Sequence, residues 1–433
     1  MSFLKVLGFD PAKHNVKTEI VAGITTFLTM AYILAVNPDI FGALEGMGMP
    51  KGAVFTATAL AAIVGTLVMS LYAKKPYALA PGLGLNAFFV YTVCLTMGYS
   101  WQFALTAVLI EGIIFIILTV TNVREAIINA IPKAMKSAVS AGIGLFIAFI
   151  GMVNAGIIVD DGGTIISLGT ITSGPALLAI VGLVITSVMM ILKVPGAMLI
   201  GIIVTAVIGI PFGITKFDGV VSSVPSVAPI FWKFEFHNIL SWDMLIVVFT
   251  FLFIDMFDTI GTVIGVSKKA NAINPDGTIP GVKKVLMADA WATIAGAIFG
   301  TSTTTTYVES ASGVAEGGRT GLTSFTVAVC FAIALFFAPL FTAIPSAATA
   351  PALIVVGVMM MSSILDVDFN DFSESIPAYI CMIMMPLAYS ISDGIMLGMI
   401  SYVVLNVICG KYKKINLMTW ILAILFILRY ALL

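Results

Sequence analysis

The stretch 300–310 (GTSTTTTYVES) combines a run of hydroxyl side chains with one carboxylate, Glu309. Its β-branched threonines favour extended backbone, and the small residues that follow favour a helix. The sequence therefore predicts an extended segment that becomes a helix near Ser310, with Glu309 at the junction. A helix N-terminus has unpaired N–H groups and partial positive charge, so Glu309 can cap the helix or bind a ligand. We favour ligand binding, because Ser or Thr would cap the helix at a lower desolvation cost.

A pair of carboxylates lies in the stretch 255–262 (DMFDTIGT). Asp255 and Asp258 are three residues apart and share one face of a helix, which Thr259 and Thr262 extend. Two carboxylates in a low-dielectric environment repel each other, so at least one of them is expected to bind a proton near neutral pH. The pair is a candidate site for a polar ligand and for a proton. The alternative, which we rate lower, is a structural pair held by backbone N–H groups.

Asn86, Phe88 and Tyr307 are further candidates for the substrate site. The Asn86 amide offers a donor and an acceptor, either to a ligand or, equally, to structural hydrogen bonds. Phe88 and Tyr307 can offer a stacking face, although aromatic rings in apolar helices usually face the core or lipid. Asp289 is expected to face the threonine run or to cap a helix start. Glu111 has no role that the sequence specifies.

The composition defines the surroundings of these residues. Of 433 residues, 60% are hydrophobic and 10% are charged, which is typical of a polytopic membrane protein. A net charge of −1 argues against nucleic acid as a partner, since that requires clustered Lys and Arg. The cysteines and histidines have no metal-ligand spacing, and no nucleophile–base pair or cofactor motif is recognisable. The sequence therefore predicts no enzyme activity, no cofactor and no metal site.

Apolar stretches close to the ~20 residues that cross a bilayer as a helix recur along the chain. We expect fourteen spans, at 18–41, 53–73, 77–96, 102–121, 133–155, 174–192, 195–212, 241–265, 286–301, 303–317, 321–344, 346–364, 376–391 and 393–410. Most basic residues between spans then fall on the side of the polar tail 1–17, and only Lys51, Lys216 and Lys233 fall on the other. Because basic loops favour the cytoplasm, we expect a cytoplasmic N-terminus in a plasma or bacterial inner membrane. Whether the apolar tail 415–433 crosses the membrane or lies on its surface is left open.

Seven spans in each half predict a repeat of inverted topology, as in many secondary transporters. Ala57, Gly65 and Gly82 recur 231 positions later as Ala288, Gly296 and Gly313, and Ile131 and Pro132 recur as Ile344 and Pro345. This repeat pairs the third span, which Pro81 and its glycines interrupt, with the tenth, which the threonines interrupt. The expected fold is all-α with a 7+7 inverted repeat. Segments 3 and 10 are its two broken helices, which contain short extended strands and direct their half-helix N-termini at a common point.

Five stretches resemble the AzgA-like purine permeases of the nucleobase:cation symporter 2 (nucleobase/ascorbate transporter) group. They are 27–38 (FLTMAYILAVNP), 80–89 (APGLGLNAFF), 255–262 (DMFDTIGT), 300–310 (GTSTTTTYVES) and 317–323 (GGRTGLT). The resemblance covers essentially the whole chain and implies fourteen segments in two domains. The implied core domain comprises 18–122 and 241–344, and the implied gate domain comprises 123–240 and 345–433, with its C-terminal apolar segment. An elevator-type movement of the core, often in a homodimer, is also implied.

The resemblance also implies roles for individual residues. Glu309 and Asp255 match the substrate-binding carboxylates of the tenth and eighth segments. Asp258 matches the acid one turn further on that is associated with proton coupling. Asn86 matches a polar residue of the third segment.

The expected function is proton-coupled uptake of purine nucleobases, with guanine or hypoxanthine favoured over adenine. Purines present adjacent N–H donors and a flat face, which suit a bidentate carboxylate beside an aromatic ring. Leu83 and Glu316, where the family frequently has Met and Ala, bear on which purine is preferred. The alternative function is that of an anion transporter or exchanger of related fold. The carboxylates near the site argue against it, because they would repel an anion unless they were protonated.

Overall fold

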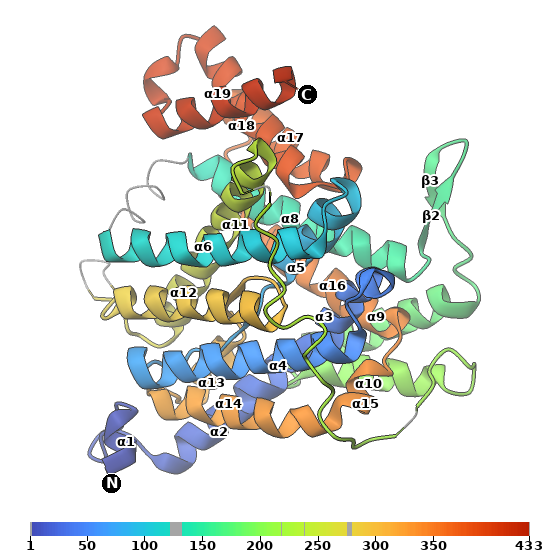
Figure 1. Ribbon diagram of the computed structural model, residues 1–433, viewed down its shortest axis with the longest axis vertical. Coiled ribbons are helices and arrows are strands. Elements are labelled where there is room, and N and C mark those ends of the chain that lie inside the picture. Colours follow the sequence, from blue (N-terminus) through green and yellow to red (C-terminus); the bar gives the residue numbers. More distant parts are fainter. Residues whose placement is uncertain (1, 122–131, 218, 238, 275–278, 433) are drawn as a thin grey trace.

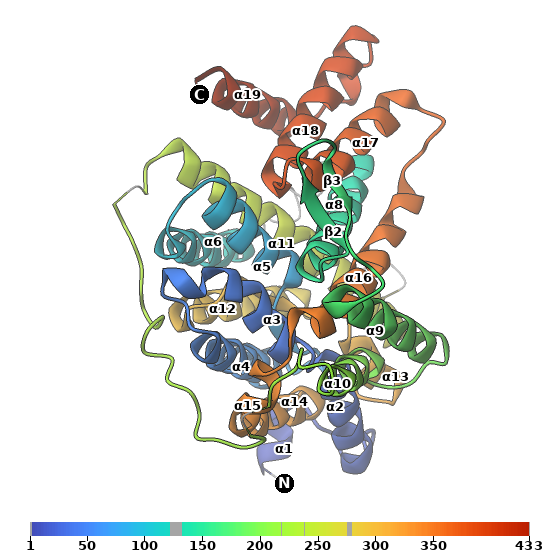
Figure 2. The same ribbon diagram turned by 90° about the vertical axis from the view of Figure 1, so that its right-hand side faces the viewer.

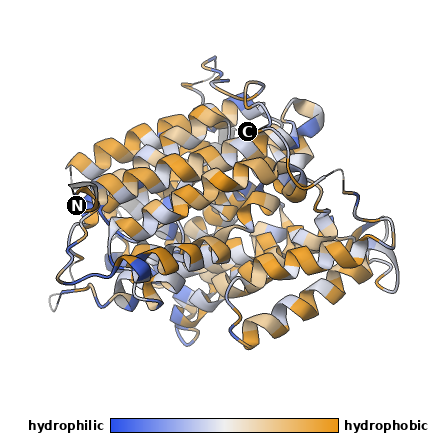
Figure 3. Ribbon diagram, turned by 90° about the horizontal axis from the view of Figure 1, so that it is seen from below, coloured by the Kyte–Doolittle hydropathy of each residue, from blue (hydrophilic) through white to orange (hydrophobic). Residues whose placement is uncertain are grey.

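The computed structural model describes residues 2–121, 132–217, 219–237, 239–274 and 279–432, which form mostly helices (Figure 1). Within these ranges, nine helices are long and apolar enough to cross a membrane, and they fall on nine of the fourteen expected spans. Hydrophobic residues run along the helices, and hydrophilic residues gather mainly in the connections (Figure 3). The chain is therefore a multi-pass membrane protein. Whether the other five expected spans also cross stays a prediction.

The elements follow the expected spans closely. In the first half of the chain they are α1 (Ser2–Val6), α2 (Val16–Met30), α3 (Ile33–Phe41), η1 (Gly42–Met47), α4 (Lys51–Val68), η2 (Met69–Ala73), β1 (Leu79–Pro81), α5 (Leu83–Ala87), η3 (Phe88–Thr96), α6 (Trp101–Thr121), α8 (Lys133–Asn154), β2 (Ile158–Asp161), β3 (Ile165–Leu168), α9 (Gly174–Ile191) and α10 (Ala197–Gly209). In the second half they are α11 (Trp242–Lys269), α12 (Val282–Phe299), β4 (Thr304–Thr306), α13 (Ser310–Ala315), α14 (Gly321–Ala334), η4 (Leu335–Phe337), α15 (Ala338–Thr342), α16 (Ser346–Met361), η5 (Ser362–Asp366), α17 (Phe372–Leu387), α18 (Ile391–Ile408), η6 (Tyr412–Lys414) and α19 (Leu417–Leu432).

The helices form two groups, which lie beside each other in Figure 2. In the first group, α12 packs against α4 and α6, and α14 packs against α2 and α4. In the second group, α16 packs against α8, α9 and α10, and α17 packs against α8 and α18. The division of the chain into core and gate domains, and their movement as separate units, stay predictions. The domain boundary expected at 122–123 lies outside the described residues.

Two three-residue strands connect the two halves of the first group. β1 and β4 pair in antiparallel orientation, with Ala80 opposite Thr305. Pro81 ends β1, and the β-branched threonines form β4, as their backbone preferences predict. Each strand leads into a short helix, α5 after β1 and α13 after β4. The predicted change from extended to helical backbone near Ser310 is thus confirmed, since α13 begins at this residue.

The internal match at 231 positions coincides with one pair of helices. α4 and α12 are each 18 residues long, and their first residues, Lys51 and Val282, are 231 positions apart. The strands do not keep this offset, because the link from α4 to β1 is longer than the link from α12 to β4. Gly82 precedes α5, whereas Gly313 lies inside α13, so the predicted equivalence of these two glycines is wrong. The complete 7+7 repeat stays a prediction.

A glycine brings α12 close to the threonine run. A Cβ added at Gly296 would lie 2.5 Å from Thr304 Oγ1 and 2.8 Å from the carbonyl oxygen of Ser302. We expect Gly296→Ala to destabilise the protein by about 1–3 kcal/mol, because overpacking forces backbone shifts, and to lower its Tm in detergent. Gly265→Ala is the matched control, since a Cβ there meets nothing within 4 Å. An equal loss of Tm in both variants would contradict this explanation.

Candidate functional site

A cavity of about 500 Å³ lies between the two groups of helices. Its wall on the first group includes Tyr32, Leu83, Asp258, Thr262, Tyr307 and Glu309. Its wall on the second group includes Val139, Ser140, Ile143, Met359, Ser363 and Asp366. The first wall therefore combines the residues that follow β4, the start of α5 and one face of α11. A ligand in this cavity would touch both groups of helices.

Glu309 is the N-cap residue of α13, but its side chain makes no capping hydrogen bond within the described structure. Instead, Glu309 Oε1 accepts a hydrogen bond of 2.7 Å from the hydroxyl of Tyr32. The backbone carbonyl of Glu309 accepts a hydrogen bond of 2.6 Å from Ser312 Oγ. The half-buried carboxylate lines the cavity. Its geometry thus fits a ligand-binding group rather than a helix cap.

Tyr307 lines the cavity beside Glu309, and its side chain is 7% exposed. Its hydroxyl donates to the carbonyl oxygen of Pro81 over 2.5 Å, and its backbone N–H donates to the carbonyl oxygen of Ala78. Both bonds attach Tyr307 to the segment that contains β1. With the hydroxyl used in this way, the ring is the part of Tyr307 that can contact a flat ligand.

Asp258 lines the cavity from α11 and is half-buried. Among the described residues, the charged side chains that line the cavity are all acidic, namely Asp258, Glu309 and Asp366. Asp366 lies at the surface, where it forms a salt bridge of 3.4 Å with Lys133. Carboxylates accept hydrogen bonds from N–H groups and repel anions. The cavity is therefore suited to a ligand that presents donors or positive charge.

Asp255 lies on a different side of α11 from Asp258. It is fully buried and does not line the cavity, and its Oδ1 accepts a hydrogen bond of 2.9 Å from Thr259 Oγ1. Thr259 Oγ1 also lies 3.0 Å from Asp289 Oδ2 and 2.6 Å from Thr305 Oγ1. Asp255 and Thr259 therefore face β4, while Asp258 faces the cavity. The role of Asp255 in substrate binding stays a prediction.

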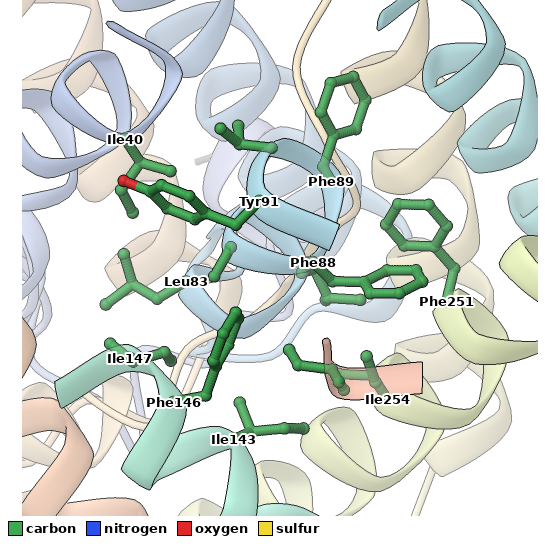
Figure 4. Packing of buried hydrophobic residues seen from close by; sticks show 14 of the residues in the cluster. Ile40, Leu83, Phe88, Phe89, Tyr91, Ile143, Phe146, Ile147, Phe251 and Ile254 are labelled. Atoms are coloured by element: carbon green, nitrogen blue, oxygen red, sulfur yellow. The ribbon is translucent and has the colours of Figure 1, made fainter. Parts of the chain in front are cut away.

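Asn86 and Phe88 also lie outside the cavity wall. Asn86 is fully buried, and its Oδ1 accepts a hydrogen bond from Ser302 Oγ, which is the structural alternative expected for this amide. Phe88 packs edge-on against Phe251, with ring centroids 4.8 Å apart. Figure 4 shows these two rings side by side in the hydrophobic core, with Ile254 nearby. A direct contact of Asn86 or Phe88 with substrate stays a prediction.

The threonine run is bonded to helices on several sides. Thr303 Oγ1 donates to Glu111 Oε2 over 2.5 Å, which gives this buried carboxylate a structural partner that the sequence does not indicate. The backbone N–H and the hydroxyl of Thr306 donate to Asp289 Oδ1 over 2.9 and 3.0 Å. Asp289 thus faces the threonine run, which is one of the two placements expected for it. These contacts position the backbone that leads to Glu309.

Tyr32 is a site residue that the sequence did not single out. The only signal for it is a hydroxyl-bearing aromatic within the apolar stretch 27–38, close to the Asn37 and Pro38 that interrupt helical regularity. Its partner Glu309 is 277 positions away. Residue spacing within one segment cannot reveal such a pair.

Comparisons with known proteins show the family and the fold of the chain. The sequence pattern of the Permease family matches residues 17–397. The guanine/hypoxanthine permease PbuG of Bacillus subtilis is 45% identical over 431 residues, 98% of each chain. The adenine permease AdeQ of Escherichia coli is 42% identical over 415 residues, 96% of this chain and 93% of the permease. The transmembrane domain of a cyanobacterium bicarbonate transporter, BicA, shares the fold with a TM-score of 0.66 at 16% identity, covering 89% of this chain and 97% of that domain. The family pattern and these relatives match nearly the full length of the chain. The chain therefore belongs to the Permease family, as its resemblance to purine permeases predicts.

Proposed function

We propose that this protein imports purine nucleobases, guanine or hypoxanthine in preference to adenine, together with protons. The observation that carries the proposal is the pair of carboxylates, Asp258 and Glu309, in a cavity between two groups of helices. Relatives that are 45% and 42% identical bear the names guanine/hypoxanthine permease and adenine permease. These names support a purine as the ligand.

The chemistry of the cavity matches that of a purine base. The adjacent ring and exocyclic N–H groups of guanine, or the ring N–H groups of hypoxanthine, can donate to carboxylate oxygens of Glu309 and Asp258, and the Tyr307 ring can stack on the flat face. A site that offers buried acceptors rejects ligands without matching donors, because the acceptors would stay unpaired. The acidic lining disfavours the alternative of an anion transporter, even though the fold is shared with a bicarbonate transporter.

The proposal includes an elevator-type movement of the core domain, with its two broken helices, against the gate domain. Alternating access requires that one end of the interface between the two domains be open while the other end is closed. The cavity reaches the surface at one end, where Ser362 and Asp366 are exposed. At the other end, Asp39 of α3 accepts hydrogen bonds of 2.7 Å from both Ser346 Oγ and Thr349 Oγ1 of α16. Because the Asp366 end is expected in the cytoplasm, this arrangement corresponds to an inward-open state.

Replacing the Glu309 carboxylate by an amide should strongly reduce uptake. Glu309→Gln keeps the shape of the side chain but loses charge-assisted hydrogen bonds to the base, so we expect uptake of radiolabelled hypoxanthine to fall by at least about tenfold. Glu45→Gln is the matched control, because Glu45 is exposed and does not line the cavity. Membrane levels are compared by immunoblot. Normal uptake by Glu309→Gln at a normal membrane level would remove this residue from the site.

The second variant tests the route of the proton. If Asp258 carries it, Asp258→Asn should either transport hypoxanthine without the wild-type stimulation by external acid or not transport at all. Initial uptake rates at two external pH values, with the variant and the wild type at equal membrane levels, measure this. Acid-stimulated uptake that persists in Asp258→Asn would assign the proton to Asp255 or Glu309.

The hydrogen bonds of Asp39 test the movement itself. Asp39→Asn and Ser346→Ala both weaken the closed end, so each should change the maximal uptake rate by roughly threefold to tenfold with little change in KM. Asp39 also bonds Thr349 and forms a salt bridge of 3.6 Å with Lys51, so Ser346→Ala affects one of the several contacts that Asp39→Asn weakens. The double variant should therefore resemble Asp39→Asn. Fully additive effects, or a change confined to KM, would contradict this role.

A further inference from the structure

We propose that Tyr32 is a positioning residue for substrate binding. Its hydroxyl holds the Glu309 carboxylate in one orientation and leaves the second carboxylate oxygen for the base. The inference rests on the proposed function, because it assumes that Glu309 binds the purine.

Tyr32 lies where the first span is interrupted. α2 ends at Met30 and α3 begins at Ile33, so the side chain projects from the turn between two helices. It is 2% exposed and lines the cavity, and its hydroxyl donates to Glu309 Oε1 over 2.7 Å. A buried phenol in a mostly apolar wall requires a hydrogen-bond partner. Here the partner is the Glu309 carboxylate, which is placed to bind the ligand.

Further contacts hold the same two segments together. Thr29 Oγ1 and Ser312 Oγ are 2.9 Å apart. A Cβ added at Gly313 would lie 2.2 Å from Thr26 Oγ1 and 2.3 Å from the carbonyl oxygen of Ala22, so α13 packs directly on α2. Both helices belong to the first group. A movement of this group against the other would leave the hydrogen bond of Tyr32 intact, which makes it an orienting contact and not a gate.

The hydrogen bond determines what Glu309 presents to a ligand. A donor bound to a carboxylate oxygen fixes the plane of the group. Tyr307 and Asp258 line the same cavity, and Asp258 is its second carboxylate. With Oε1 bound to Tyr32, Oε2 and Asp258 are the acceptors for the N–H groups of the base. A carboxylate fixed in advance loses less conformational freedom on binding, which raises affinity.

Tyr32→Phe removes the hydroxyl and keeps the ring. In proteoliposomes supplied with radiolabelled hypoxanthine, we expect KM to rise by about tenfold while the maximal rate changes by less than about twofold. Thr29→Val is the matched control, because it removes a neighbouring hydroxyl contact between α2 and α13 without touching Glu309. Its KM should stay within about twofold of the wild type. Equal increases in both variants would indicate a general packing effect and would overturn the proposal.

Ligand binding without transport supplies a second readout. Without the hydroxyl, the Glu309 carboxylate is no longer fixed before binding, so hypoxanthine should raise the Tm of Tyr32→Phe less than it raises the Tm of the wild type or of Thr29→Val. The rise in Tm that hypoxanthine causes in the purified protein measures this without transport. An unchanged KM, or a rise in Tm equal to that of the wild type, would overturn the role of Tyr32. Normal uptake by Glu309→Gln would instead overturn the proposed function, so the two failures are distinguishable.

Discussion

The pairing of β1 with β4 is the constraint on which the rest of the site depends. Extended backbone in an apolar environment has N–H and C=O groups that no helix satisfies, and it persists only where other groups bond them. Ala80 lies opposite Thr305 in the pair, and the hydroxyl of Thr66 bonds both the N–H and the C=O of Leu79. This pairing fixes where α5 and α13 begin. It thereby places Glu309 at the edge of the cavity.

The acidic residues around this pair fall into two sets. Glu111, Asp255 and Asp289 are fully buried and accept hydrogen bonds from threonine hydroxyls. Asp258 and Glu309 are half-buried and line the cavity. The buried set positions the threonine run and α11, while the second set is accessible to a ligand. The structure thus separates carboxylates that hold the fold from carboxylates that can bind, although their chemistry is the same.

Local residue preferences predicted more of the fold than of the site. The change to helix at Ser310 follows from β-branching and small residues, which act within a few positions. The different surroundings of Asp255 and Asp258 could not be predicted, because residues three apart on a helix diverge by about 60° and only the packing of α11 decides which one is buried. The contact between Tyr32 and Glu309 was equally hidden, since nothing in either segment specifies the other. Periodicity shows which residues lie on the same side of a helix, but it does not show which element or cavity that side contacts.

The distance along the chain between β1 and β4 has a consequence for synthesis. A ribosome adds about 5–20 residues per second, so roughly 10–45 s pass between the translation of Ala80 and that of Thr305, its partner in the strand pair. During this interval the nascent β1 has the hydroxyl of Thr66 from its own half, but it lacks the second strand. The binding wall is therefore completed only after the second half has entered the bilayer. A chain released before Thr304 would lack the strand that pairs with Leu79–Pro81, so this segment would not keep the extended backbone that it has in the complete fold.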